Sequence, residues 1–466
     1  MNKNHGKATG QVHGSGSVNG GVAVIAEQKH GNGGVAAIAE QKHGNGGVAA
    51  IAEQKHGNGG IAAIAEQKHG NGGVAAATEQ KQRIGNVTEL KQGNGAALLE
   101  ALFYRSVSRA ELARVSGLTR SAVSDHIDEM IMKGLICEIG AGEAERGRKP
   151  VLLDIDPTYG YYGGFYLSRS ICRVGITDIK GNVLAGASLD AEMHSQPDDV
   201  IVQASAKLLG MLRDSGIPAD KLIGVGASVP GPLDTKTGDI MMPPGFSLWH
   251  RYPLKKNLAE HIRRPVYAEN NAASLTLAEI RFGYGRDHDS FIFILVDSGI
   301  GGGIVVNRRR LVGVGGYGSE LGHTSIRQHG RMCACGNQGC LERYAAIPIL
   351  LNDCFSPDEG VTTWKQVVDG AEKGDARCME AMGREADHLA VTLVNFVNAL
   401  EPQAIVFTGQ IGYRPELFTR MLKERVCSSV IMRDIRQVEV LPSPLSVEYE
   451  ILAAASIAID AFITGA

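Results

Sequence analysis

The stretch GHTSIRQHGRMCACGNQGC, residues 322–340, contains three of the eight cysteines of the chain. Cys333 and Cys335 flank one alanine, Cys340 follows five residues later, and His323 precedes Cys333 by ten residues. One imidazole and three thiolates form the Cys₃His set that suits tetrahedral zinc. Four protein ligands close the coordination shell, so the loop predicts a structural Zn2+ site. Chance clustering and a redox pair are the alternatives.

Acidic and amide side chains surround this loop in the sequence. Glu320 lies in GSELGH just before it, Glu342 lies in CLERY just after it, and AENNAAS, residues 268–274, comes earlier in the chain. Carboxylates and amides held around a rigid loop can bind a ligand rich in hydroxyl groups, such as a sugar. The alternative is that Glu320 and Glu342 only support the metal ligands or face solvent.

Length, composition and charge limit the number of domains and the kinds of partner. The chain has 466 residues with a 44% hydrophobic share, enough for two or three domains. Its formal net charge of -3 gives no overall attraction to nucleic acid or to a membrane. The first residues lack a signal-peptide core, and the apolar C-terminal run is too short to span a bilayer. We expect a cytoplasmic protein with no membrane partner.

The first 87 residues are built on a repeat of thirteen residues. GGVAVIAEQKHGN starts at Gly20, and near-copies follow through residue 75. Each unit could form only a two-turn helix, which is marginal in water, and the GNGG linkers break any continuation. We therefore expect residues 1–87 to form a flexible low-complexity tail. Metal binding is the alternative reading of the repeated histidines His30, His43, His56 and His69.

Residues 88–155 carry the signals of a winged helix-turn-helix. Ser108 and Glu111 predict a capping box, Gly117 ends that helix, and Thr119 caps a second helix. Two strands around a basic loop would then form the wing. The alternative is a helical hairpin with a solvated loop. The candidate DNA-binding residues are Thr119, Arg120, Ser121, Ser124, Arg146, Arg148 and Lys149.

After Pro150 strands and helices alternate, an α/β pattern long enough for two lobes. The runs VGASVPGPLD, VYAENNAASLTLAE, DSGIGGGIVV, GGYGSELGHT and CACGNQGCLERYAA resemble the ROK family of bacterial repressors and sugar kinases. The resemblance implies an actin-like (ribonuclease H-like), two-lobed sugar-kinase-type domain over residues 156–466. The helix-turn-helix resembles that of the family's repressor branch.

The resemblance also implies which residues bind sugar, and it reveals two departures. The implied sugar contacts are Asn270, Asn271, Glu320, His323 and Glu342. The kinases have an aspartate as general base where this chain has Asn271, and a carboxamide cannot accept the proton. In the first hairpin, the family's phosphate-loop aspartate, glycine and threonine are replaced by Tyr166, Ser168 and Ser170.

These features predict a sugar-responsive DNA-binding transcriptional regulator, a repressor of carbohydrate-uptake or catabolism genes without kinase activity. Its partners would be operator DNA, a sugar or sugar-derivative effector and further copies of the chain in a homodimer or homotetramer. One alternative is an ATP-dependent kinase of hexoses or N-acetylhexosamines that also binds DNA. Another is a regulator whose ligand is a phosphotransferase protein or a sugar phosphate.

Overall fold

The computed structural model describes residues 93–466, apart from 143–148, 170, 191–194, 235, 244, 315, 317, 446–448 and 466. In the repeat region it describes the backbone of residues 22–27, 36–43, 46–52 and 64–65. The chain divides into two units, Met1–Ile84 and Gly85–Ala466. Arg146, Arg148 and Ser170 lie outside the described residues.

The repeats form strands. β1 (Val22–Glu27), β2 (Ala36–His43), β3 (Gly46–Ala52) and β4 (Ile64–Ala65) form an antiparallel sheet in chain order. The register aligns equivalent residues of successive repeats, as in Ile25↔Ile38 and Ile38↔Ile51. In these segments, pairing between repeats supplies the hydrogen bonds that an isolated two-turn helix lacks.

The second unit begins with three helices and a small sheet. These are α2 (Asn94–Tyr104), α3 (Arg109–Ser116) and α4 (Arg120–Met132), with β5 (Val107–Ser108), β6 (Ile136–Ala141) and β7 (Val151–Ile155) in the order β5-β7-β6. Ser108 caps α3 by accepting the N–H of Glu111, and Gly117 ends it with φ 72°. Thr119 caps α4 by accepting the N–H of Ala122. We call residues 93–155 the head.

The first lobe is built on a five-stranded mixed sheet. Its order is β10-β9-β8-β11-β12, with β8 antiparallel to β9 and parallel to β11. The strands are β8 (Tyr161–Leu167), β9 (Cys172–Asp178), β10 (Val183–Ser188), β11 (Leu222–Val229) and β12 (Val266–Asn270). The helices of this lobe are α5 (Pro197–Asp214), α6 (Leu254–Ile262) and α13 (Tyr449–Thr464).

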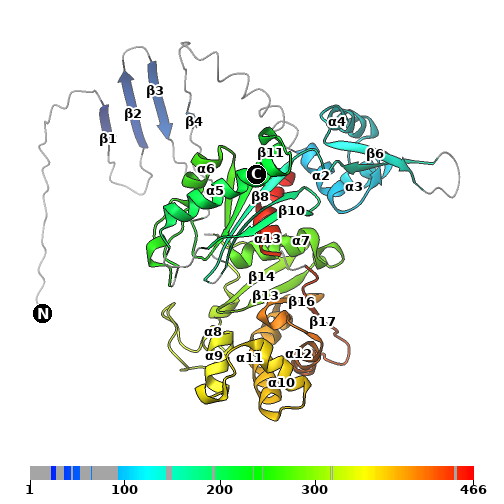
Figure 1. Ribbon diagram of the computed structural model, residues 1–466. Helices are drawn as coiled ribbons and strands as arrows, with labels where there is room; N and C mark the ends of the chain where they lie inside the picture. The colour runs from blue at the N-terminus through cyan, green and yellow to red at the C-terminus, as the bar shows by residue number, and fades with distance from the viewer. Residues whose placement is uncertain are drawn as a thin grey trace, which may run out of the picture. The chain divides into compact units, whose positions relative to one another are not determined.

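Helices cover both faces of this sheet (Figure 1). A Cβ on Gly163 would meet Leu208 of α5, and one on its neighbour Gly164 would lie 2.5 Å from the carbonyl oxygen of Ile451 in α13. Because successive strand residues point to opposite faces, α5 and α13 lie on opposite sides. On the α13 side the helix backbone packs directly on the strands, since a Cβ on Gly226 would lie 1.8 Å from the carbonyl oxygen of Ala454.

The second lobe repeats this plan with a mixed sheet in the order β15-β14-β13-β16-β17. Its strands are β13 (Phe291–Val296), β14 (Ile300–Val306), β15 (Arg309–Arg310), β16 (Ala404–Gly409) and β17 (Glu439–Pro442). Its helices are α8 (Glu342–Ala345), α9 (Ile347–Cys354), α10 (Trp364–Glu372), α11 (Ala376–Leu400) and α12 (Glu416–Ser429). Helix α7 (Asn271–Phe282) follows β12 and contacts both α13 and β14.

The α/β expectation is confirmed by these two mixed sheets. Across the part of the chain that the structure describes, no helix is both long and apolar enough to cross a bilayer.

Candidate metal centre and polar cavity

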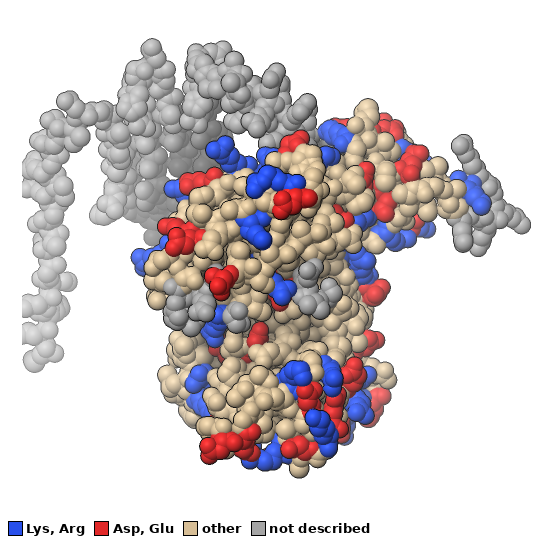
Figure 2. All heavy atoms as spheres, in the orientation of Figure 1, with Lys and Arg blue, Asp and Glu red and all other residues tan. Residues whose placement is uncertain are grey.

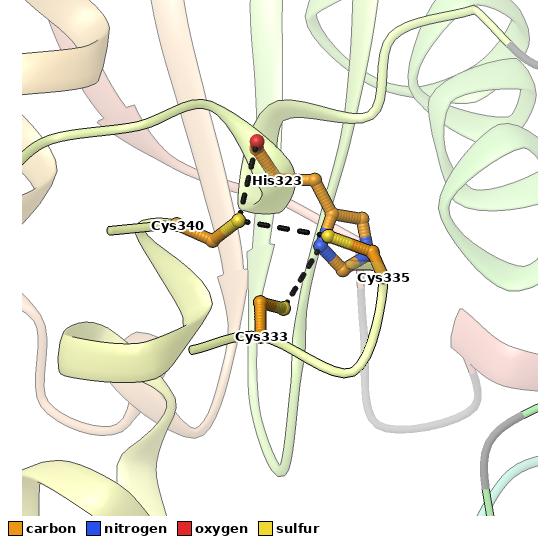
Figure 3. Close-up of side chains that lie close together, drawn as sticks. All are labelled: His323, Cys333, Cys335 and Cys340. Atoms are coloured by element: carbon orange, nitrogen blue, oxygen red, sulfur yellow. Dashed lines mark hydrogen bonds between the residues drawn. The ribbon is translucent and has the colours of Figure 1, made fainter. Parts of the chain in front are cut away.

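The four predicted metal ligands come together (Figure 3). Cys333 Sγ lies 3.6 Å from His323 Nδ1, and Cys335 Sγ lies 3.7 Å from Cys340 Sγ. All four donor atoms lie within 4.8 Å of one another. With Zn–S of about 2.3 Å and Zn–N of about 2.0–2.1 Å, tetrahedral zinc needs S···N near 3.6 Å and S···S near 3.8 Å. The donor set and its spacing therefore fit zinc.

Backbone turns hold the cysteines at this spacing. The N–H of Cys333 donates to the carbonyl oxygen of Asn337 at 2.8 Å, which closes a tight turn around Cys335. Gly339 has φ 79°, and a Cβ there would lie 1.8 Å from the carbonyl oxygen of Arg327. The sulfur atoms of Cys335 and Cys340, 3.7 Å apart, are not joined by a disulfide, whose S–S bond is about 2.05 Å long. The loop is therefore shaped for a metal by its own backbone.

A polar cavity lies at the start of α7. It is lined by Asn270, Arg310 and Glu320, together with backbone of the β14 glycines and of the loop before Glu320. Burial raises the pKa of the Glu320 carboxyl, with a smaller lowering influence from His323 and a smaller raising influence from Glu342. His323 and Glu342 are thus close enough to Glu320 to act on its carboxyl. The structure thus gathers Asn270, Glu320, His323 and Glu342 in one region.

Two of these side chains also fix the local backbone. Asn270 caps α7, with Oδ1 accepting the N–H of Ala273 at 2.8 Å. Glu342 Oε2 accepts the N–H of Ile300 at 3.1 Å, at the end of the glycine-rich turn between β13 and β14. Glu342 therefore ties the glycine-rich turn to the segment that carries the cysteines.

Asn271 faces different partners. Its Nδ2 donates to the carbonyl oxygen of Leu167 at 3.0 Å, and its Oδ1 accepts the hydroxyl of Ser228 at 2.8 Å. The carboxamide thus joins the ends of β8 and β11 to α7. Asn271 does not line the cavity described above, and its predicted contact with sugar stays a prediction.

The side of the site expected to hold phosphate is occupied by protein groups. Tyr166 is buried in β8, and Ser168 Oγ accepts the N–H of Ile171 within its own hairpin turn. Asp297 begins the glycine-rich turn, and its Oδ1 accepts the Nε2–H of Gln410 at 2.5 Å. Sequence reasoning missed the pairing of Asp297 with Gln410.

The predicted DNA contacts lie at the start of α4. Thr119, Arg120 and Ser121 are exposed, Ser124 is half-buried one turn later, and Lys149 is exposed at the end of the loop between β6 and β7. Acidic and basic side chains are interspersed on the face shown in Figure 2.

Two lobes with mixed sheets, a polar cavity between their elements and a Cys₃His centre beside it define an actin-like protein of the sugar-kinase type. The model of the ROK family matches residues 169–461. The chain belongs to the ROK family.

Both kinds of ROK protein are among its relatives. The chain is 29% identical to the xylose repressor of Bacillus subtilis (strain 168) over 383 residues, 82% of this chain and 98% of that protein. It is 30% identical to the glucokinase of Thermotoga maritima over 310 residues, which are 63% of this chain and 96% of that protein. The alignment with the repressor is longer than the two lobes, so it extends into the head.

A solved structure supports the same fold. The crystal structure of a ROK family transcriptional regulator, a homolog of the E. coli MLC protein, matches with a TM-score of 0.66 and 21% identity. The match covers 83% of this chain and 97% of that one. At this identity it is evidence for the fold alone.

Proposed function

We propose that this protein is a sugar-responsive, DNA-binding transcriptional regulator that represses carbohydrate-uptake or catabolism genes and lacks kinase activity. The observation that carries the proposal is the presence, in one unit, of a polar cavity and a head whose helix α4 exposes its first turn. The relative that aligns over both parts is named a repressor.

In this proposal the head is a winged helix-turn-helix. Helix α4 enters the major groove with Arg120, Ser121 and Ser124 near base edges, and Thr119 contacts the backbone while it caps the helix. The loop between β6 and β7 is the wing. It brings Arg146, Arg148 and Lys149 to phosphates or to the minor groove.

The sugar would bind in the polar cavity. Asn270, Glu320 and Glu342 offer amide and carboxylate groups for hydroxyls, and Asn271 completes the set. His323 turns Nδ1 to the cysteines, which leaves Nε2 for the ligand. Zn2+, held by His323, Cys333, Cys335 and Cys340, would fix the loop and the histidine without activating water, because its shell is closed.

The proposed absence of kinase activity rests on two residues. Asn271 cannot act as a general base, and Tyr166 cannot replace a metal-binding aspartate. The similarity to a glucokinase favours, as the second candidate, an ATP-dependent kinase of hexoses or N-acetylhexosamines that also binds DNA.

We further propose a homodimer or homotetramer working in the cytoplasm. Ile431, Met432 and Ile435 expose 65%, 64% and 76% of their surface just after α12, an apolar cluster suited to contact with a second copy. Two heads would then read operator half-sites about 34 Å apart, or a multiple of that distance.

The test is the affinity of the full chain for DNA from its own promoter region, measured by fluorescence anisotropy at fixed salt with and without single monosaccharides. A severalfold change caused by one sugar without ATP supports the proposal. Sugar phosphates and a phosphotransferase protein serve as separate arms. ATP consumption with hexoses or N-acetylhexosamines would favour the kinase instead, and unchanged DNA affinity in every arm would refute sugar-responsive regulation.

A further inference from the structure

Tyr104, the last residue of α2 in the head, is held between two arginines of the lobes. The guanidinium of Arg281 lies 5.8 Å from the centroid of its ring, and that of Arg308 lies 5.1 Å from it. Arg281 also donates to the Tyr104 hydroxyl at 3.1 Å. The ring therefore meets two cations that belong to different segments of the lobes.

Arg281 is buried, with 4% of its surface exposed, and it is neutralised from two sides. It forms ion pairs with Asp460 of α13 at 2.5 Å and with Glu100 of α2 at 2.6 Å. A buried charge that is paired with carboxylates of two elements restricts the movement of both elements, because moving either one leaves charge unpaired. Arg281 thus fixes the position of α2 relative to α7 and α13.

The other end of α7 reaches the proposed sugar site. The helix has 12 residues, about 18 Å of rigid rod. Asn270 caps its first turn at the cavity, and Arg281 lies in its last turn at the head. A shift of α7 caused by a ligand at its first turn is therefore delivered to Glu100 and Tyr104.

A second element also runs from the cavity to Tyr104. Arg308 lies in the turn between β14 and β15, where it pairs with Asp289 at 2.5 Å. Two residues further, Arg310 lines the cavity and pairs with Glu269 of β12 at 2.5 Å. The Glu269–Arg310 pair joins the sheets of the two lobes at the cavity. A change in the spacing of the lobes there also changes the position of Arg308.

We propose that Tyr104 is a positioning residue through which a ligand in the cavity changes the orientation of the DNA-binding head. Helix α7 packs against both α13 of the first lobe and β14 of the second. Its Arg281 is held by Asp460 of α13, whereas Arg308 belongs to the sheet of the second lobe. The ring therefore contacts one cation tied to each lobe and responds to a change in the relative position of the lobes. This inference rests on the proposed function. Helix α7 and the β14–β15 turn would form the physical connection between the polar cavity and the DNA-binding head.

The experiment compares Tyr104→Leu with Tyr413→Leu in the full chain. Tyr413 is a matched control, because its ring also lies near two cations, Lys365 at 5.1 Å and Arg414 at 5.5 Å. Both cations belong to the second lobe, and Tyr413 does not line the cavity. For each protein, DNA affinity is measured with and without the sugar that acts on the wild type, and sugar affinity is measured separately by calorimetry.

We expect Tyr104→Leu to bind the sugar within about twofold of wild type, while the change in DNA affinity caused by the sugar falls below about twofold. Tyr413→Leu keeps the full change. A full change in Tyr104→Leu would overturn the inference. If no sugar acts on the wild type, the proposed function has failed instead. Should Tyr104→Leu not fold, Arg308→Ala, at a partly exposed side chain, takes its place with the same expectations.

Discussion

Replacing Asn271 with aspartate restores the residue type of a sugar-kinase base, and we expect it to destabilise the protein without creating a kinase. The Nδ2 of Asn271 donates to the Leu167 carbonyl at 3.0 Å, and a carboxylate cannot donate. The Leu167 acceptor then loses its partner and faces a negative oxygen. An unsatisfied, partly buried acceptor costs about 1–3 kcal/mol. The added negative charge beside it places the expected loss of unfolding free energy in the upper part of this range, at about 2–3 kcal/mol.

The assay is urea unfolding of Asn271→Asp beside Asn270→Asp. The second variant is the matched control, because Asn270 uses only its oxygen to cap α7, and aspartate caps equally well, within about 0.5 kcal/mol. The folded protein disfavours this carboxylate and so raises its pKa, and the loss in Asn271→Asp should therefore shrink as the pH falls and be smallest below about pH 4, where the protonated carboxyl can donate again. Equal stability of the two variants would refute the role assigned to the amide. Phosphorylation of a hexose by Asn271→Asp would refute the idea that the phosphate side is also closed.

Three further outcomes follow from other parts of the molecule. Cys335→Ser should lower the bound zinc, measured by mass spectrometry, from about one ion per chain and lower the melting temperature, whereas Cys427→Ser should retain the metal. Burial raises the pKa of Glu279 to about 7, above its value of about 4.3 in unfolded chains, so its contribution to stability is full below about pH 4.3 and is lost as the pH rises through about 7. Glu279→Gln should flatten the unfolding free energy across that range, and an unchanged slope would contradict this assignment. Arg120→Ala should weaken operator binding by about 1–3 kcal/mol and relax the preference for the operator sequence. Lys149→Ala should instead reduce the slope of log DNA affinity against log salt concentration by about one. Equal losses on specific and random DNA for Arg120→Ala would contradict a base contact.

Features encoded locally in the sequence could be predicted well. Ser108, Gly117 and Thr119 mark the ends of α3 and α4 because caps depend on residues within one turn. The cysteines lie within eight residues of one another, so their spacing alone indicated the metal site whose donor atoms the structure brings together. The alternation of strands and helices predicted the α/β class for the same reason, since each strand is marked by its own residues, but it did not predict the strand order or direction in the two sheets.

Contacts between distant segments could not be predicted in this way. Arg281 is separated from Glu100 by 181 residues and from Asp460 by 179. The pairing of Asp297 with Gln410 likewise joins turns 113 residues apart. No periodicity or motif encodes such partners, because they depend on how lobes and head pack. The strands in the repeats were not predicted for a related reason, since the sequence of one repeat does not show that it pairs with the next.

The place of α13 has a consequence for how the protein is made. This helix contacts β8, β11, α7 and α2, yet the ribosome produces it after all of them. Until α13 emerges, Gly164 and Gly226 face a groove with no helix in it, and Arg281 lacks the carboxylate of Asp460. The first lobe and its attachment to the head therefore mature only when synthesis has reached residue 460. A nascent chain has both α3 and α4 early, but it cannot hold them in the finished orientation until then.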